Sequence, residues 1–317
     1  MAEKIEDLLV KGYGTWKNNL VLAAPHILSA VAVLILVFVA VVVAMIGIFA
    51  VAALSGPSIS SIVQGGPAAS GGYTTTILLL LALAVVAGAV FILAIFLASA
   101  FFTSGAIGMS MKAMETGKTS IDDMIAYGRK KFLAVFYASI LEMLLSLLGL
   151  LLFIPAALAF LAGAPGPGLA LLLLGLLALI VYLIVLQLAL VLMPYAIVIK
   201  DLGAMDGLRE SYGTFMKNKL ATLILWFVVS AVGAGLGLAV GVFTSLLDII
   251  PLLGALLSLL VNLCYAVFSM VVLTPIFMLW WTAYYMDKAG PSRSRFSERP
   301  SRPQSREQPS KQSGIYI

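Results

Sequence analysis

Residues 20–54 read LVLAAPHILSAVAVLILVFVAVVVAMIGIFAVAAL, a run without Asp, Glu, Lys or Arg. About 20 apolar residues suffice for a helix to cross the hydrocarbon core of a bilayer, so this run predicts a transmembrane helix. Its 35 residues would form a straight helix of roughly 52 Å, against a core of about 30 Å. We therefore expect an elbow at Pro25, with residues 16–25 near the interface and the span after it.

Five further apolar stretches follow along the chain, at 74–111, 132–162, 169–199, 220–247 and 252–286. The composition agrees with membrane insertion, because 62% of the residues are hydrophobic and only 10% are charged, where soluble domains have about 25% charged residues. Pro194 and Pro275 predict kinks in the fourth and sixth spans. The predicted fold class is all-α, a polytopic transmembrane helical bundle with six spans.

The basic residues predict the orientation of the chain in the membrane. All 19 Lys and Arg residues lie in four segments, 1–19, 112–131, 200–219 and 288–311. With six spans, these segments share one face of the membrane, and the loops of the opposite face, 55–73, 163–168 and 248–251, contain no Lys or Arg. Because basic loops stay on the cytoplasmic side, we expect a multi-pass protein of the cytoplasmic membrane with both termini inside.

The sequence divides into two regions. Residues 1–288 are expected to form the transmembrane domain. Residues 289–317 form a basic tail rich in Ser, Arg and Pro, which we expect to be disordered because it cannot bury a core. This tail is also the part of the chain that we expect to contact anionic lipids.

A threefold internal repeat is predicted, with copies at about 1–117, 118–201 and 202–288. Each copy would comprise a short interfacial helix, a basic elbow and a transmembrane hairpin, and the three parallel hairpins predict a pseudo-threefold bundle. A Tyr-Gly pair precedes each elbow, and we expect its glycine to end the interfacial helix. The interfacial elbows are expected at Lys17, Asn18, Lys130, Lys131, Lys217 and Asn218.

Glu142 is the one charged residue deep inside an apolar span, and such a residue is a candidate functional site. Gln187 lies at a similar depth in the fourth span, and Asn262 lies in the sixth. These three residues form the candidate intramembrane polar site. One interpretation is a proton or cation relay. The other is a protonated Glu142 that hydrogen-bonds Gln187 or Tyr182 and holds the helices together.

Gly233, Gly237 and Gly241 are spaced by four residues in the fifth span, which predicts a smooth face for close helix packing. A lone histidine, His26, and a lone cysteine, Cys264, cannot form a metal cluster or an intrachain disulfide. The sequence outside the spans has no phosphate-binding loop, dinucleotide fingerprint or paired catalytic carboxylates. We therefore expect no catalytic residue, cofactor or metal, and no nucleic-acid partner.

One part of the sequence resembles a known pattern. Residues 193–201, MPYAIVIKD, are followed by Gly203-Ala204, Leu208, Ser211 and the elbow 217–219, KNK. This run resembles uncharacterised prokaryotic six-span membrane proteins, for which we expect an archaeal family. It is also similar to the membrane domain fused to some glycerophosphoryl diester phosphodiesterases. The chain has no room for the soluble catalytic barrel, so the resemblance implies the architecture without the activity.

The sequence leaves two main functional hypotheses. The first is a non-enzymatic integral membrane protein, acting as a scaffold, a membrane-organising factor or the membrane subunit of a larger complex with a membrane or cytoplasmic protein partner. The alternative is a transporter or channel for ions or small solutes that uses Glu142 and Gln187. A membrane-embedded lipid enzyme is disfavoured, because the residue spacing assembles no polar catalytic cluster near either interface.

Overall fold

The computed structural model describes residues 4–54 and 72–289, and the chain forms helices and no strands in these two ranges. The elements in chain order are α1 (Ile5–Asn18), the 3-10 helix η1 (Leu20–Ala23), α2 (Ala24–Leu54), α4 (Gly72–Thr116), α5 (Ile121–Leu148), the 3-10 helix η2 (Gly149–Phe153), α6 (Ile154–Leu161), α7 (Pro165–Leu190), α8 (Met193–Ile199), α9 (Ala204–Lys217), α10 (Lys219–Leu247), α11 (Leu253–Phe268), the π-helix η3 (Ser269–Leu273) and α12 (Thr274–Ala289). The predicted all-α class is confirmed. The predicted tail after Ala289 and residues 55–71 of the first outer loop lie outside the described residues.

Six helical segments of the described chain are long and apolar enough to cross a membrane, in agreement with the six predicted stretches. They are Leu20–Ala50, Leu81–Thr116, Ile121–Leu161, Pro165–Ile199, Lys219–Leu247 and Leu253–Ala289. These segments identify a multi-pass membrane protein.

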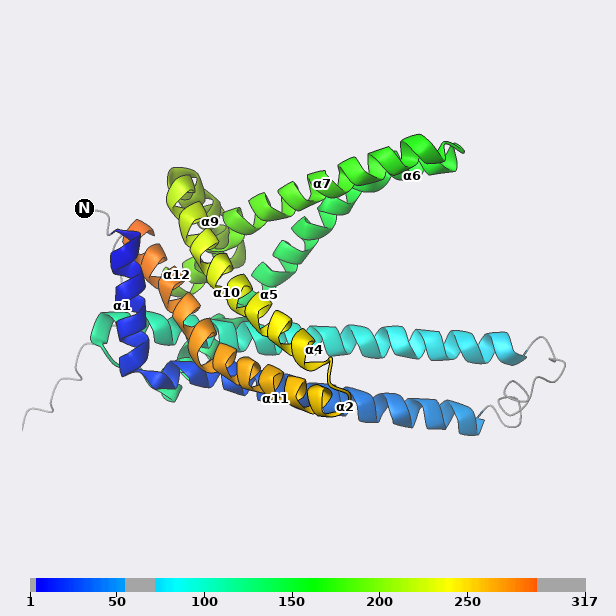
Figure 1. The fold of residues 1–317 in the computed structure, drawn as a ribbon, viewed down its shortest axis with the longest axis horizontal. Coiled ribbons are helices and arrows are strands. Elements are labelled where there is room, and N and C mark those ends of the chain that lie inside the picture. The colour runs from blue at the N-terminus through cyan, green and yellow to red at the C-terminus, as the bar shows by residue number, and fades with distance from the viewer. Residues whose placement is uncertain (1–3, 55–71, 290–317) are drawn as a thin grey trace, which may run out of the picture.

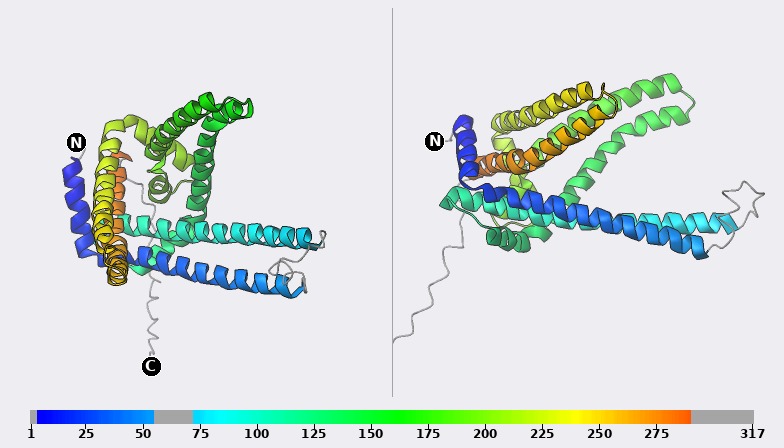
Figure 2. Two further views of the ribbon diagram at one scale, coloured as in Figure 1. Left: turned by 45° about the vertical axis from the view of Figure 1, so that its right-hand side comes forward. Right: turned by 60° about the horizontal axis from the view of Figure 1, so that its bottom comes forward.

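The spans pair as three hairpins that meet at one end of the molecule and diverge toward the other (Figure 1). In the first hairpin α2 packs on α4, in the second α6 packs on α7, and in the third α10 packs on α11. Figure 2 shows the same divergence from two other directions. No more than 11% of the residues in the most apolar stretch of any span are buried within the chain. The three hairpins therefore pack together at one end of the molecule and diverge beyond it.

The core lies where the hairpins converge. We call this region the collar; it comprises α1, residues 100–116 of α4, residues 121–136 of α5, α8, α9 and α12. Its largest fully buried apolar side chains include Leu8, Ile107, Met193, Ile197 and Tyr284. The collar carries the buried contacts between sequentially distant helices, so it fixes the positions of the three hairpins.

Asparagines end the two interfacial helices α1 and α9. Asn19 and Asn218 have non-helical backbone angles, and the side-chain amide of each donates to the carbonyl four residues earlier, in Thr15 at 3.1 Å and in Thr214 at 3.0 Å. An asparagine side chain that bonds the backbone competes with the helical pattern, so the chain turns into the following span.

The middle elbow, predicted at Lys130 and Lys131, is absent, because α5 runs without a break from Ile121 to Leu148. No asparagine stands at this position, and lysine is a good helix former. The glycines of the Tyr-Gly pairs also do not end the helices, since Gly14 and Gly213 lie inside α1 and α9. The internal repeat therefore stays a prediction, with two similar elbows and one that differs.

All three prolines expected at bends lie near a break in a span. Pro25 is the second residue of α2, directly after η1, and Pro194 follows the turn between α7 and α8. Pro275 is the second residue of α12, after the π-helix η3. Proline is tolerated in the first turn of a helix, where its missing N–H group has no helical partner, and this explains the positions of Pro25 and Pro194. At Pro275 the helical segment continues from η3 into α12, and the change to π-helical spacing accompanies the proline.

Candidate functional site

The candidate intramembrane site is not one polar cluster in this structure. Glu142 lies half-buried on α5, and its carboxyl group makes no hydrogen bond with a described residue. Gln187 is exposed on α7, and its side chain likewise has no hydrogen-bond partner in the described ranges. The hydroxyl of Tyr182 donates to the carbonyl of Leu145 at 2.6 Å and not to Glu142.

Asn262 belongs to the third hairpin and to a separate polar network. Its amide donates to the carbonyl of Ser258 at 2.8 Å, one turn earlier on α11. The hydroxyl of Ser258 in turn contacts the carbonyl of Thr244 at 3.1 Å and a carboxylate oxygen of Asp248 at 2.7 Å. These bonds join α11 to the end of α10, so Asn262 has a structural environment distinct from that of Glu142. Whether any of the three candidate residues carries a function stays a prediction.

The glycine stripe of α10 faces aromatic side chains and open space. A methyl group added at Gly233 would lie 3.6 Å from the ring of Phe277, and one at Gly237 would lie 3.5 Å from the hydroxyl of Tyr265. A methyl group at Gly241 would meet nothing within 4 Å. In the described chain this stripe therefore leaves room and does not bring two backbones together.

Glycines that sequence reasoning missed make the tightest helix contact of the collar, between α4 and α5. A methyl group at Gly105 would lie 2.6 Å from the side chain of Met124 and 2.8 Å from its carbonyl oxygen. Gly108 would meet Tyr127, and Gly128 would meet the ring of Phe101. The small-residue run 104–108, SGAIG, is the signal that could have identified this contact.

Two lysines of α5 contact the turn that follows the C-terminal end of α8. Nζ of Lys131 lies 2.6 Å from a carboxylate oxygen of Asp201, and Nζ of Lys130 lies 3.1 Å from the same oxygen. Lys131 is buried and also donates to the carbonyl of Leu202 at 3.1 Å. Asp201 has a φ of 61°, a left-handed conformation that aspartate tolerates better than most residues. The backbone N–H of Leu202 donates to the carbonyl of Ile197 at 3.1 Å, and this hydrogen bond caps the C-terminal end of α8.

The electrostatics of this contact favour a charged carboxylate. Partial burial alone would raise the pKa of Asp201, but the hydrogen bonds and the charges of Lys131 and Lys130 outweigh it and hold the pKa below its usual value. The predicted elbow lysines therefore act as a bridge from α5 to the turn between α8 and α9. A second ion pair, between Lys200 and Glu210, lies between the end of α8 and α9.

Buried hydroxyl groups fasten α9 and α10 to their neighbours. The hydroxyl of Ser211, which is fully buried on α9, donates to the carbonyl of Ala189 at 2.6 Å near the end of α7. The hydroxyls of Thr222 on α10 and Tyr284 on α12 lie 2.8 Å apart, and both are fully buried. The first contact joins an interfacial helix to the fourth span, and the second joins the fifth span to the sixth.

Two tryptophans fasten α1 to the sixth span. The indole N–H of Trp16 donates to the carbonyl of Val271 in η3 at 3.0 Å, and the indole N–H of Trp280 donates to the carbonyl of Leu9 at 3.1 Å. A methyl group at Gly12 would lie 2.5 Å from the Trp280 ring, so α1 can lie this close only because glycine stands there. Within the described ranges, no group of three or more His, Cys, Asp or Glu side chains is arranged to hold a metal ion.

Comparison with known proteins finds one family. A domain of unknown function, DUF7847, matches residues 68–287, which run from before the second span through nearly all of the sixth. The chain belongs to this family. No curated protein and no solved structure matches the chain. Since the match to DUF7847 gives no link to glycerophosphoryl diester phosphodiesterases or to archaea, both of these resemblances stay predictions.

The DUF7847 match covers most of the collar as well as five of the spans. It includes the α4–α5 contact at Gly105, the Lys131–Asp201 ion pair and the Ser211–Ala189 bond. Helix α1, which carries Trp16, lies before the matched residues.

Proposed function

We propose that this protein is a non-enzymatic integral membrane protein that organises other membrane components, as a scaffold or as the membrane subunit of a larger complex. The collar holds three hairpins in fixed directions. Their apolar flanks inside the membrane, together with α1 and α9 at the membrane surface, are the contact surfaces for protein partners and lipids.

The proposal is supported by a contrast in packing. The collar is tightly packed, whereas the apolar stretches of the spans bury few of their residues against the rest of the chain. Because the hairpins diverge from one another, their helices expose long apolar flanks. Leu173 and Leu177 on α7, for example, are each about 60% exposed. In a membrane such flanks contact lipid or the spans of other proteins. An arrangement that fixes helix directions while leaving their flanks free suits the assembly of other spans around it.

The alternative is transport of an ion or a small solute. Its support is Glu142, because a half-buried carboxyl group in an apolar span is costly and such groups mark ion paths in many membrane proteins. Neither Gln187 nor Asn262 hydrogen-bonds Glu142 in the described chain. This arrangement favours the scaffold over a polar path.

We also propose the cytoplasmic membrane as the location, with both termini and the collar on the cytoplasmic side. The support is the distribution of charge. Every described Lys and Arg lies on the collar or on the segments that adjoin it, while the described residues of the opposite loops have none. The basic tail would then face the anionic cytoplasmic leaflet.

The test is photo-crosslinking of the full-length protein in its native membrane. A photoreactive amino acid at Leu173, on the exposed flank of α7, should give protein adducts of defined mass. The matched control is Ile107, which is fully buried in the collar and should give no adduct with another protein. The same membranes are extracted into lipid nanodiscs, and the size of the complex is measured.

Adducts at Leu173 that are made of lipid only, together with a monomer in the nanodiscs, would contradict the proposal. The transport alternative has a separate test. Purified protein in liposomes should move no ion or solute, and a flux that Glu142→Gln abolishes would replace the scaffold by a transporter.

A further inference from the structure

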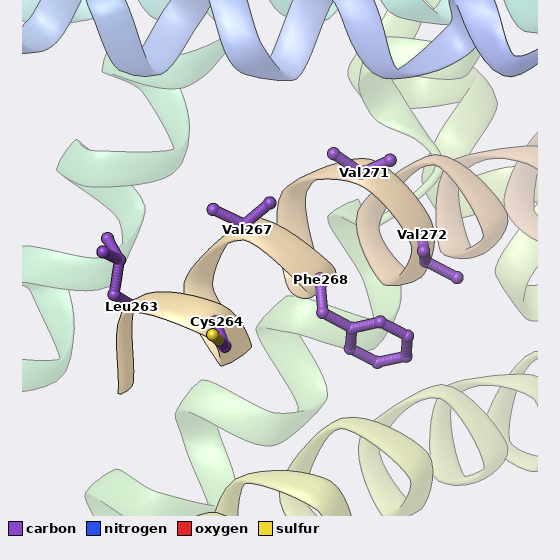
Figure 3. A pocket seen from close by; sticks show the side chains of 6 residues that line it. All are labelled: Leu263, Cys264, Val267, Phe268, Val271 and Val272. Atoms are coloured by element: carbon purple, nitrogen blue, oxygen red, sulfur yellow. The ribbon is translucent and has the colours of Figure 1, made fainter. Parts of the chain in front are cut away.

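An apolar pocket of about 430 Å³ opens beside the sixth span (Figure 3). The space is largely open on the side away from the helix, because one helical segment lines it. The lining comes from α11 and η3 and consists of Leu263, Cys264, Val267, Phe268, Val271 and Val272.

The pocket lies where only an apolar ligand is stable. All its lining residues belong to one candidate membrane span, and the lining consists almost entirely of carbon with a single thiol. Water gains no hydrogen bonds in such a space, whereas the acyl chains of the surrounding lipid fill it at no cost in polar contacts.

The collar end of the pocket is close to the membrane surface. Val271 lines the pocket, and its carbonyl accepts the indole N–H of Trp16 at 3.0 Å. Tryptophan is enriched at the level of the lipid headgroups, so the side of the pocket next to Trp16 is the side where a headgroup would lie.

Two lysines without ion pairs lie in the segments that meet at the α1 elbow, next to Trp16 along the chain. Asn19, three residues after Trp16, donates to the carbonyl of Gly117 at 3.0 Å, so the α1 elbow contacts the end of α4. Lys17 and Lys118 flank this contact, and both are exposed. Neither of them has an acidic partner among the described residues.

We propose that this pocket holds one acyl chain of an anionic phospholipid, whose phosphate group is bound by Lys17 and Lys118. The apolar lining selects a lipid over a soluble phosphate. The two cationic groups select an anionic lipid over a zwitterionic one, since each lysine near the surface attracts the negative charge of an anionic headgroup.

The test is lipid binding to the purified full-length protein, measured by native mass spectrometry in detergent. Phosphatidylglycerol and phosphatidylcholine with the same acyl chains are titrated separately. We expect phosphatidylglycerol to bind about ten- to thirty-fold more tightly to one site. The double variant Lys17→Gln/Lys118→Gln should remove this preference.

The α9–α10 elbow offers a matched control. Lys217 and Lys219 flank Asn218 there. The carbonyl of Asn218 accepts from the hydroxyl of Tyr284 on α12 at 3.5 Å, but in the described chain this elbow makes no hydrogen bond to a residue of the pocket lining. The double variant Lys217→Gln/Lys219→Gln should keep the preference for phosphatidylglycerol. A third variant, Val267→Trp, should fill the pocket and weaken binding of both lipids while leaving the melting temperature of the protein unchanged.

Equal affinity for the two lipids in the wild type would overturn the proposal. It would also fail if the control pair lost as much preference as Lys17 and Lys118, or if Val267→Trp had no effect on binding. Glycerol 3-phosphate, which has no acyl chain, should not compete, and competition would mean a simple phosphate site. Loss of this lipid site would leave the scaffold proposal intact, because protein adducts at Leu173 do not depend on it.

Discussion

Trp16 and Val271 are joined by a hydrogen bond of 3.0 Å that replaces one lost in the sixth span. In a continuous α-helix the carbonyl of Val271 would accept from residue 275, but this residue is Pro275, which has no N–H group. The chain changes to π-helical spacing at Ser269–Leu273, and the indole of Trp16 supplies a donor from outside. The proline kink therefore becomes the point where α1 is attached.

Replacing Trp16 by phenylalanine should destabilise the collar by about 1–3 kcal/mol, because the half-buried carbonyl of Val271 would lose the donor. The phenyl ring keeps much of the apolar contact, so the loss reports mainly the hydrogen bond. The free energy of unfolding of purified protein in detergent, followed by circular dichroism, measures this effect.

Trp280→Phe is the matched control for this variant. Its indole donates to the carbonyl of Leu9 at 3.1 Å, but Leu9 lies inside α1 and keeps its helical donor. We expect a smaller loss, of about 0.5–1 kcal/mol. If both variants lost the same free energy of unfolding, the Val271 carbonyl would not depend on Trp16 as its hydrogen-bond donor.

Gly105→Ala should destabilise the contact between α4 and α5 by about 1–3 kcal/mol, because the added methyl group would lie 2.8 Å from the carbonyl oxygen of Met124. Gly88→Ala, on the same helix, has nothing within 4 Å and should stabilise the helix by about 0.5–1 kcal/mol. Thermal unfolding of both variants under identical conditions measures the difference. A neutral Gly105→Ala would mean that the helices separate easily at this position.

Asp201→Asn should reduce stability at neutral pH by no more than about 1 kcal/mol, since the Asp201 side chain is 56% exposed and solvent screens its two ion pairs. Asparagine tolerates the left-handed backbone at this position, so the variant tests charge alone. Because the lysines lower the pKa of Asp201, its contribution is present above the pKa of the unfolded chain, about 3.9, and disappears as the pH falls through the folded value.

Melting temperatures of the wild type and of Asp201→Asn, taken between pH 7 and pH 3, test this pH dependence. The difference between the two proteins should shrink below about pH 4. A difference that stays constant down to pH 3 would show that the charge of Asp201 does not contribute to stability.

The six spans could be predicted from the sequence because each one is a long run of apolar residues, and hydrophobicity alone determines insertion. The collar could not be predicted. It depends on single contacts between distant residues, such as Ser211 with Ala189 and Lys131 with Asp201, and neither pair has a periodic signal. The middle elbow was predicted wrongly because charge marks the membrane surface but does not by itself break a helix.

The candidate polar site shows a second limit of sequence reasoning. The depth of a residue in the membrane follows from counting residues along the span. This count predicted a similar depth for Glu142 and Gln187. Rotation about the helix axis depends on which face each neighbour covers, and the apolar residues of these spans give no clear face. Asn262 was grouped with them although it bonds Ser258 within the third hairpin.

The orientation of the chain is tested with single cysteines in a Cys264→Ser background. A cysteine at Lys118, in the turn after α4, should react with a membrane-impermeant thiol reagent only in inside-out vesicles. A cysteine at Gly163, in the turn between α6 and α7, should react only in intact cells. The reverse pattern would place the basic residues outside and would contradict the charge rule.

The same background tests whether Glu142 lies in a dry or a wet environment. Single cysteines at 138–146 cover more than two turns of α5 around it. We expect no labelling from either side, because the diverging hairpins place lipid or protein around this segment, and a charged reagent enters neither. A Glu142→Gln variant should then fold with equal or greater stability, since it removes the cost of a carboxyl group in an apolar span. Labelling along one helical stripe that includes position 142 would instead demonstrate a water-filled path, and it would favour transport over the scaffold.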